Sequence, residues 1–447
     1  NNEFTNGKPQ IDGNKNLFIK LLKEHSYISN EQYDQGEKLF NVNSDELIDE
    51  KEAFLVRTSN SEEPSIIQKA LIEGQYDIIY EIFVKQKLFK YTPMNDEIGI
   101  LHLPIQHHHF HIVKLLIEKV KTNIETFNKH GYTPLHISVM YDNMDALNFL
   151  LQHEVCINEK SKAIRGFTAL HFAIMENKDQ FLKRLLQYKS IQLDMIDNYG
   201  NTPILCAAKI GHLNFFKQLY KHSSNLKARN FYGQDVLSLV CIHGHLHILE
   251  YLISMNMNME NEYDSQTPFF IAIQYGHMNI MDRLIQENID INKPNSIGEY
   301  AIHVAAKHNQ LQAFNRLIEH KAKLYVKCRD GHTPLYYGIL KKSIDIVRRL
   351  LELQTMFDFV SFSIAIRYKR LAILDLFIHQ IHSKFIGKNG FQKGLFEVLR
   401  RRLKYMYITD RNLDVLLRLV NLYASYFLNG TNSKGRTLLH DLIFFQK

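Results

Sequence analysis

The 447-residue chain contains no apolar run that approaches the roughly 18 residues needed to cross a bilayer, so no membrane-spanning helix is expected. It has only four cysteines, which lie far apart with no C-x-x-C pair. This spacing favours free thiols in a reducing compartment over a disulfide framework. Residues 1–16 are polar and lack the basic-then-apolar order of a signal peptide. These absences predict a cytoplasmic protein.

Motifs that carry chemistry are also missing. The sequence has no Gly-x-Gly-x-x-Gly after a strand, no phosphate loop, no Gly-x-Ser-x-Gly and no His-Glu-x-x-His. We therefore predict no catalytic residue and no cofactor. The net charge of +7 is mild for this length. It favours acidic partners slightly and does not indicate a nucleic-acid-binding protein.

What the chain does contain is a repeat. The segment Gly131-Tyr-Thr-Pro-Leu-His136 recurs with variations at intervals of 32 to 35 residues. A fixed period of this size marks a stacked array in which no unit can bury its apolar face alone. The seven clear units open at Gly131, Gly166, Gly200, Gly233, Ser265, Gly298 and Gly331.

Each unit predicts two short helices joined by a tight turn. Thr202 followed by Pro203 is a helix opening, with a hydroxyl that can cap and a proline at the first helical position. Glycines such as Gly211 recur between the two helices and supply a left-handed backbone there. The units at Gly233 and Gly298 lack the Thr-Pro pair, so we expect their first helices to begin less sharply.

Together, the Gly-x-Thr-Pro-Leu-His opening, the turn between the helices (Gly211-His212 in one repeat) and the Leu-Leu pair in the second helix (Leu185-Leu186 in another) closely resemble the ankyrin repeat family. The resemblance implies an all-α ankyrin solenoid with hairpin finger loops, helical extensions at both ends and a concave groove that binds other proteins. The predicted boundaries are an N-terminal helical cap at 1–62, two degenerate repeats at 63–126, the main array at 127–354, a degenerate repeat at 355–382, a basic helical segment at 383–430 and a truncated opening at 431–447.

The start and the end of the chain leave an open question. The first residue is not methionine, and the last repeat opening at Gly435 stops at Lys447 after one helix. We expect that the full-length protein continues beyond these limits, or that the final half-unit serves as a C-terminal cap.

Several histidines and cysteines invite a chemical interpretation. The run His107–His109 with His111 has ligand types that zinc uses, but it falls at the turn between two helices, so exposed rings are expected there and no metal is predicted. Other histidines occupy the repeat opening, and the resemblance implies hydrogen-bonded scaffold residues: His136, His171 and His303. Cys206 and Cys241 occupy first-helix positions and are expected in the core.

The position of a residue within its repeat predicts whether it belongs to the partner-binding surface. The end of the first helix lines the groove in the family, and the residue before the opening glycine lies near the fingertip. Tyrosine and arginine dominate interface energetics. The predicted binding residues are Tyr141, Arg165, Tyr199, Tyr232, Tyr263, Tyr275, His243 and His308. The preferred patch is formed by Tyr199, Tyr232, Tyr263 and Tyr275; the alternative is that these tyrosines pack between neighbouring fingers.

Two further features of the sequence suggest a second interaction site and a modification site. The basic residues between 383 and 411 could meet an acidic protein surface or an anionic membrane, or form the solvated face of a docked helix; they include Lys393, Arg400, Arg401, Arg402 and Lys404. By family resemblance, Asn158 and Asn292 are candidates for asparagine hydroxylation. The alternative is that their side chains only hydrogen-bond the loop.

The leading functional hypothesis is a protein–protein interaction scaffold that uses no cofactor. The alternative is a multidomain enzyme or toxin whose array recruits substrate, with catalysis in a flanking or unseen region. The Asn-, Lys- and Ile-rich composition also resembles ankyrin effectors that intracellular bacteria inject, which would place the protein in a host cytosol.

Overall fold

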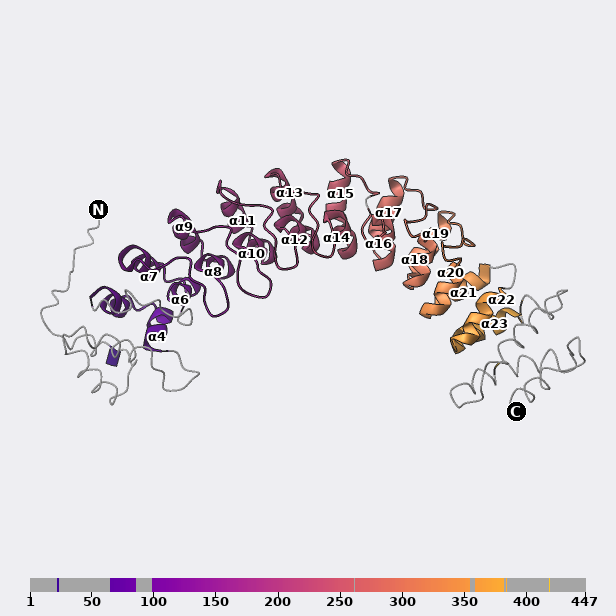
Figure 1. Ribbon diagram of the computed structural model, residues 1–447, viewed down its shortest axis with the longest axis horizontal. Helices are drawn as coiled ribbons and strands as arrows, with labels where there is room; N and C mark the ends of the chain where they lie inside the picture. The colour runs from indigo at the N-terminus through magenta and orange to yellow at the C-terminus, as the bar shows by residue number, and fades with distance from the viewer. Residues whose placement is uncertain are drawn as a thin grey trace, which may run out of the picture. The chain divides into compact units, whose positions relative to one another are not determined.

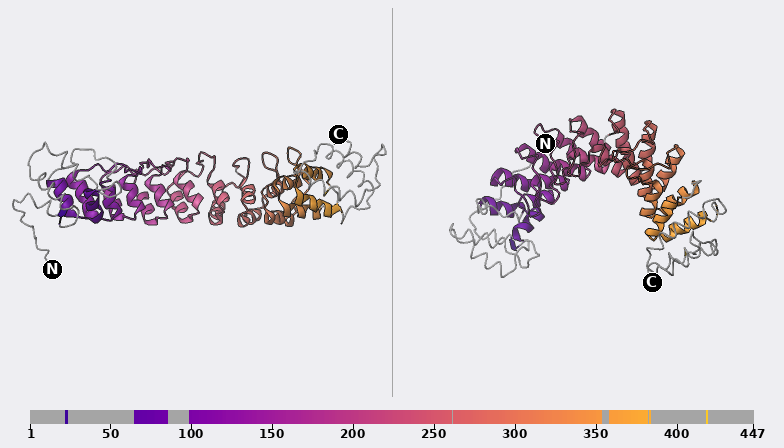
Figure 2. Two further views of the ribbon diagram at one scale, coloured as in Figure 1. Left: turned by 90° about the horizontal axis from the view of Figure 1, so that it is seen from below. Right: turned by 45° about the vertical axis from the view of Figure 1, so that its right-hand side comes forward.

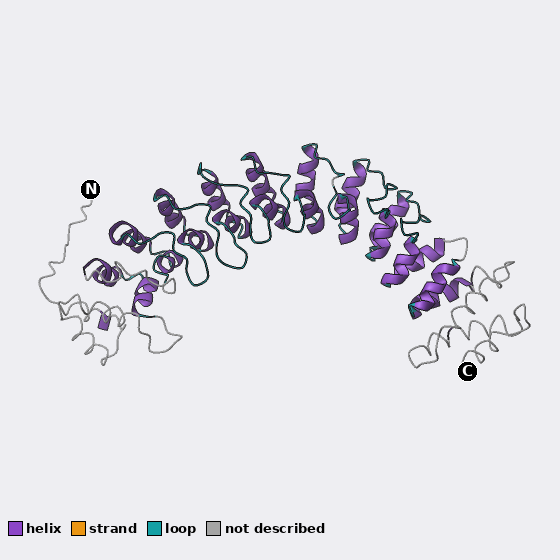
Figure 3. Ribbon diagram, in the orientation of Figure 1, coloured by secondary structure: helices purple, strands orange, loops and turns teal. Residues whose placement is uncertain are grey.

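The computed structural model describes residues 22–23, 65–85, 99–260, 262–353, 358–381, 383 and 418. The chain divides into two compact units, Asn1–Tyr232 (unit 1) and Gly233–Lys447 (unit 2). Within the described ranges the structure is helical, with a single isolated β-bridge between Tyr263 and Gln266 and no strand (Figure 3). The predicted all-α repeat fold is confirmed.

Unit 1 contains ten α-helices and two π-helical turns among its described residues. They are α4 (Ile66–Glu73), α5 (Tyr76–Tyr80), η2 (Glu81–Lys85), α6 (His102–Gln106), α7 (Phe110–Leu115), η3 (Leu116–Val120), α8 (Pro134–Met140), α9 (Met144–Gln152), α10 (Ala169–Met175), α11 (Asp179–Leu186), α12 (Pro203–Ile210) and α13 (Leu213–Lys221). The even-numbered first helices pack side by side from α4 to α12, and each contacts the second helix of its own pair. In Figure 1 the second helices α7, α9, α11 and α13 lie above the first helices α6, α8, α10 and α12.

Unit 2 repeats this arrangement in its described residues. Its helices are α14 (Val236–His243), α15 (Leu246–Ser254), α16 (Pro268–Tyr275), α17 (Met278–Gln286), α18 (Ala301–Lys307), α19 (Leu311–Glu319), α20 (Pro334–Lys341), α21 (Ile344–Leu353), α22 (Phe359–Arg367) and α23 (Leu371–Gln380). First helices contact first helices, and second helices contact second helices. Within each unit the loops between helix pairs emerge along one edge of the two layers (Figure 2).

The core lies between the two helix layers and between successive pairs. Aromatic side chains such as Phe216, Phe314 and Phe377 are fully buried there. Truncating one of them to alanine costs about 3–5 kcal/mol, since it removes buried apolar area and leaves a cavity. The glycines that end α12, α14 and α16 have φ between 76° and 82°, which confirms the predicted left-handed turn between the two helices of a pair.

The opening histidines are scaffold residues, as predicted. Thr133 caps α8, and its backbone N–H donates to Nδ1 of His136 at 3.2 Å. The other ring nitrogen, Nε2, lies 3.0 Å from the carbonyl oxygen of Phe167, in the next repeat. A carbonyl only accepts, so Nε2 carries the hydrogen. His136 therefore fastens two repeats together through a fixed neutral tautomer.

The same bond recurs at other repeats. Nε2 of His171 lies 3.0 Å from the carbonyl oxygen of Asn201, and Nε2 of His303 lies 3.1 Å from that of His332. Burial lowers the pKa of His136 and of His171 to about 4, because the charged imidazolium would lose its water. These rings stay neutral at physiological pH.

Two expectations about helix caps were wrong, although α12 begins at Pro203 as predicted. The helix α14 was expected to begin less sharply, yet Asp235 caps it: the carboxylate accepts from Ser238 N–H at 2.9 Å, and the Ser238 hydroxyl accepts from Asp235 N–H at 2.9 Å. Aspartate is as good a cap as threonine. Conversely, Thr202 makes no side-chain cap bond to α12, and its hydroxyl is buried without a hydrogen-bond partner. Leu205 stands where the histidine would be, so the ring that engages the cap in other repeats is missing.

Candidate interaction surface

The finger loops of unit 1 are held by side-chain bonds within each turn. Asn128 accepts with its side-chain oxygen from the N–H groups of His130 and Tyr132, both at 3.0 Å. Asp197 does the same for Tyr199 and Asn201, both at 2.8 Å. An Asp or Asn three residues before the opening glycine therefore fixes the fingertip backbone.

Successive fingers of unit 1 are also joined through their backbones. Lys162 N–H donates to the Gly131 carbonyl at 2.8 Å, and Asn198 N–H donates to that of Arg165 at 2.9 Å. Phe231 N–H donates to the Tyr199 carbonyl at 3.0 Å. This last contact requires a glycine at position 200, because a Cβ there would lie 2.6 Å from the Phe231 nitrogen. The fingertips thus form one hydrogen-bonded edge.

Large apolar side chains line this edge. Phe231 is 69% exposed, Tyr232 64%, Tyr199 40% and Ile164 86%. We call these four residues the fingertip strip. Tyr199 and Tyr232 were predicted from register, whereas Ile164 and Phe231 were missed. The sequence could have indicated both residues, since each is a large apolar residue two positions before the opening glycine of its repeat. The predicted residue Arg165 is exposed beside Ile164, with its guanidinium 5.7 Å from the Phe167 ring.

Other predicted binding residues lie in unit 2. Tyr275 ends α16 and is 48% exposed, and His243 and His308 are exposed at the ends of α14 and α18. The ring of His308 is still partly desolvated, which lowers its pKa, and the nearby Lys307 charge adds to the effect. Tyr263 is only half-exposed and packs towards Gly233. Since Tyr199 and Tyr232 belong to unit 1, the four-tyrosine patch stays a prediction.

Tyr141 lines a pocket of about 330 Å³ in unit 1. The pocket lies between the ends of α6 and α8 and the finger that carries His130. Its wall mixes the apolar side chains of Ile137 and Met140 with polar groups. This pocket is large enough for a single side chain of a bound protein. It brings together a helix-end residue and a fingertip residue, the two kinds of position from which partner contacts were predicted.

The two candidate asparagines join neighbouring loops. In unit 1, Asn158 donates to the Ser190 carbonyl at 2.7 Å and accepts from Gln192 N–H at 2.8 Å. In unit 2, Asn292 accepts from Lys323 N–H at 2.9 Å. Both side chains therefore stabilise the loop stack, and a modifying enzyme would need the loop to open.

The histidines and cysteines considered as candidate metal ligands or nucleophiles serve structural roles. His109 bonds the Ile72 carbonyl through Nε2 at 2.7 Å, so it serves the repeat contact. Cys206 and Cys241 are buried, as predicted, and burial raises the pKa of the Cys206 thiol to about 12. Neither thiol is poised as a nucleophile.

A different group of side chains does converge. Among the described residues, the one set of three His, Cys or acidic side chains whose donor atoms meet is Cys328, Asp330 and His332, all within 4.8 Å of one another. The sequence pattern alone did not predict this set. Its signal was three ligand types at alternate positions around a tight turn.

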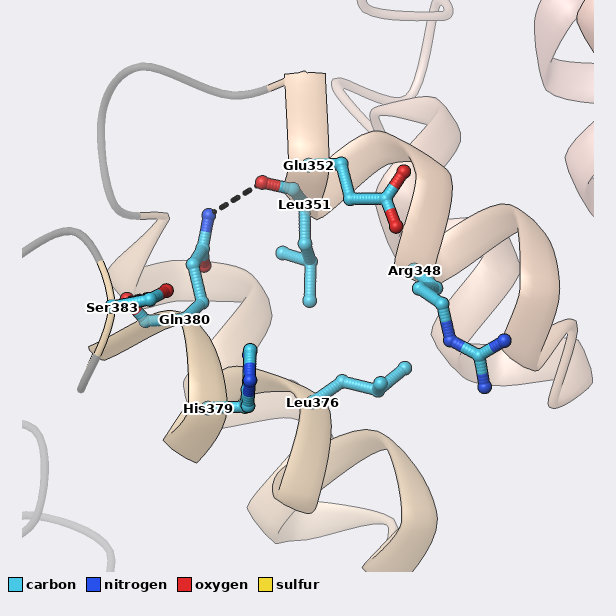
Figure 4. Close-up of a pocket in the computed structure, with 7 residues that line it drawn as sticks. All are labelled: Arg348, Leu351, Glu352, Leu376, His379, Gln380 and Ser383. Carbon is cyan, nitrogen blue, oxygen red and sulfur yellow. Dashed lines mark hydrogen bonds between the residues drawn. The ribbon is translucent and has the colours of Figure 1, made fainter.

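A second pocket, of about 310 Å³, lies between α21 and α23 in unit 2 (Figure 4). Leu351 and Leu376 provide apolar surface, and the Gln380 amide donates to the Leu351 carbonyl at 2.9 Å. Arg348 is paired with Asp345 at 3.4 Å. These groups are engaged in packing and helix contacts, so the pocket carries no evident chemistry.

Several predictions fall outside the described residues. They concern the N-terminal cap, the truncated opening at 431–447 and the basic residues Lys393, Arg400, Arg401, Arg402 and Lys404. The enzyme alternative placed catalysis in these flanks or beyond the chain. Of the described helices, none is both long and apolar enough to cross a membrane.

Comparisons with known proteins agree with this architecture. The chain is 24% identical over 208 residues to a transient receptor potential cation channel subfamily A member 1 homolog of Caenorhabditis elegans, covering 46% of this chain and 17% of the relative. It is 24% identical over 169 residues to the putative ankyrin repeat protein L371 of Acanthamoeba polyphaga mimivirus, covering 36% and 22%. It is 24% identical over 164 residues to the E3 ubiquitin-protein ligase XBAT33 of Arabidopsis thaliana, covering 36% and 31%.

The chain thus spans less than a third of each of these relatives, so their activities do not transfer to it. The family model for ankyrin repeats (3 copies) matches residues 66–161, 154–230, 222–295 and 291–359. These matches cover more than half of the chain and include every helix pair from α4–α5 to α20–α21. With its paired helices, left-handed inter-helix turns and hydrogen-bonded fingers, this chain belongs to the ankyrin repeat family.

Proposed function

We propose that the protein is an interaction scaffold that binds a partner protein through the fingertip strip of unit 1. The observation that carries the proposal is the exposure of Phe231 and Tyr232, at 69% and 64%, on a hydrogen-bonded edge. Aromatic side chains are the usual anchors of protein interfaces, because they bury a large area with few rotatable bonds.

Rigidity supports the same proposal. The backbone bonds from Phe231 to Tyr199 and from Asn198 to Arg165 hold the fingertips in place before any partner arrives. A pre-ordered surface loses less conformational entropy on binding than a flexible one does. The exposed cations Lys162 and Arg165 lie next to the strip in sequence and favour a partner segment with both apolar and acidic residues.

The test is a triple variant, Tyr199→Ala with Phe231→Ala and Tyr232→Ala, used as bait beside the unmodified chain. A matched control is Tyr220→Ala on the second helix α13, where the side chain has a similar exposure of 39%. We expect quantitative mass spectrometry to show about a tenfold or greater loss of specific partners with the triple variant and no loss with the control. Equal capture by a folded triple variant would refute the proposal.

A second surface is proposed in unit 2 at His243, Tyr275 and His308, which end successive first helices that pack side by side. Its test is Tyr275→Ala in the same experiment. Partners lost with this variant but kept by the fingertip variant would show two separate sites. A role as an effector that acts on host proteins stays a prediction, and the identity of the captured partners decides it.

A further inference from the structure

The finger turn between α19 and α20 differs chemically from the finger before it. The turns at 295–299 and 328–332 share one backbone pattern: Gly298 N–H donates to the Asn295 carbonyl at 2.8 Å, and Gly331 N–H donates to that of Cys328 at 2.9 Å. In the first turn the Asn295 amide oxygen also accepts from Glu299 N–H at 2.8 Å. A thiol is a weak acceptor and replaces that bond poorly. The hydrogen bonding of the turn therefore gives no reason for a cysteine at position 328.

The thiol has two other ligand types beside it. Donor atoms of Cys328, Asp330 and His332 lie within 4.8 Å of one another. Atoms bound to one tetrahedral zinc ion lie about 3.6 Å apart, as bond lengths of about 2.0–2.3 Å require. The difference between the two separations is about 1 Å, which is within the reach of small side-chain rotations. Cys328 is buried, whereas Asp330 is exposed, so the site is open to solvent on one side.

Neighbouring rings hold two of the ligands. The His332 imidazole stacks on the Tyr336 ring with centroids 3.8 Å apart and planes 4° apart. The Tyr337 hydroxyl lies 3.7 Å from the Cys328 sulfur, within hydrogen-bonding range for sulfur. Partners of this kind orient metal ligands and tune their affinity.

We propose that Cys328, Asp330 and His332 form a Zn²⁺ site at this fingertip, with the fourth position open to water. A thiolate with an imidazole and a carboxylate selects zinc over magnesium or calcium, which prefer oxygen ligands alone. Binding releases the thiol proton to solvent as the sulfur–zinc bond forms. The site lies on a finger loop of unit 2, where a bound ion would stiffen the turn.

The first experiment is a Co²⁺ titration of the whole chain, followed by the thiolate-to-cobalt charge-transfer band in the near ultraviolet and its displacement by Zn²⁺. The key variant is Cys328→Asn, because asparagine is the residue that the chain carries in the equivalent turn at Asn295. This variant is expected to keep the fold, which circular dichroism checks. The control is Cys156→Ser, which removes the exposed thiol.

We expect the charge-transfer band in the unmodified chain and in C156S, and its loss in C328N. In Asp330→Asn the affinity for Co²⁺ should fall by about tenfold or more. A band that survives in C328N, or no band in the unmodified chain, overturns the proposal. A second readout is alkylation by iodoacetamide: Zn²⁺ should protect the Cys328 peptide and leave the Cys156 peptide reactive. Cys328 that is alkylated to the same measurable extent with and without Zn²⁺ would show a free thiol and reject the site.

Discussion

Acid should loosen unit 1, because His136 and His171 are buried in their neutral forms. Both have a pKa of about 4 in the folded protein against 6.5 as the ordinary value, chiefly because burial disfavours the charged ring. Between these two values the unfolded chain binds protons that the folded chain does not. The stabilising contribution is therefore complete above pH 6.5 and is lost as the pH falls towards 4.

The size of the effect follows from this difference. Lowering the pH from 7 to 5 should cost about 2 kcal/mol for each histidine, or about 4 kcal/mol for the pair. The geometry gives the same direction. Nδ1 of His136 faces the Thr133 N–H at 3.2 Å, so a proton on this nitrogen would oppose another donor.

The assay is hydrogen exchange of peptides from α8 to α12 at pH 7 and pH 5, corrected for intrinsic rates, which reports local opening free energies even where repeats unfold separately. The comparison is with the double variant His136→Leu and His171→Leu, since the chain itself places Leu205 at this position. The variant should lose about 4 kcal/mol of the pH dependence. If it keeps the same pH dependence as the unmodified chain, the histidines are not the cause.

The remaining predictions concern three other features. Glu299 is 3% exposed and pairs with the half-buried Lys307 at 3.0 Å, so Lys307→Met should cost about 1–3 kcal/mol in urea unfolding. A second change, Glu299→Gln, should recover most of this loss, and no recovery would contradict the view that Lys307 compensates a buried carboxylate. Asn158 and Asn292 should each gain one oxygen when incubated with an asparagine hydroxylase, and unchanged peptide masses would reject the sites. Neutralising the basic residues at 393–404 should abolish salt-sensitive binding to anionic vesicles, and binding that is unaffected would exclude that segment.

The repeat fold was predictable because its signals are local and repeated. The Thr-Pro pair, the glycine after the first helix and the apolar spacing each have a direct backbone consequence, and seven units agree in register. Cap chemistry was less predictable, since it depends on pairs: Asp235 with Ser238 makes a cap that the Thr-Pro rule misses. Thr202 makes no cap bond although Leu205 offers a backbone N–H at the capped position, whereas the equivalent Thr333 accepts from the Tyr336 N–H at 3.3 Å.

The candidate sites were predictable only in part. Register placed Tyr199 and Tyr232 near fingertips, but it could not show that Phe231 crosses onto the neighbouring finger and stays exposed. The convergence of Cys328, Asp330 and His332 depends on how the turn directs three side chains. Composition and spacing between helices carry no information about that direction.

The bond from each opening histidine ends on a main-chain oxygen, and the residues that supply it are Phe167, Asn201 and His332. Because every residue type offers the same carbonyl, the fastening does not depend on which side chain the next repeat carries there. A repeat can therefore be duplicated, deleted or exchanged by recombination, and the new neighbour still finds its acceptor. The length of the array and the chemistry of its fingers can therefore change without new contacts having to evolve between neighbouring repeats.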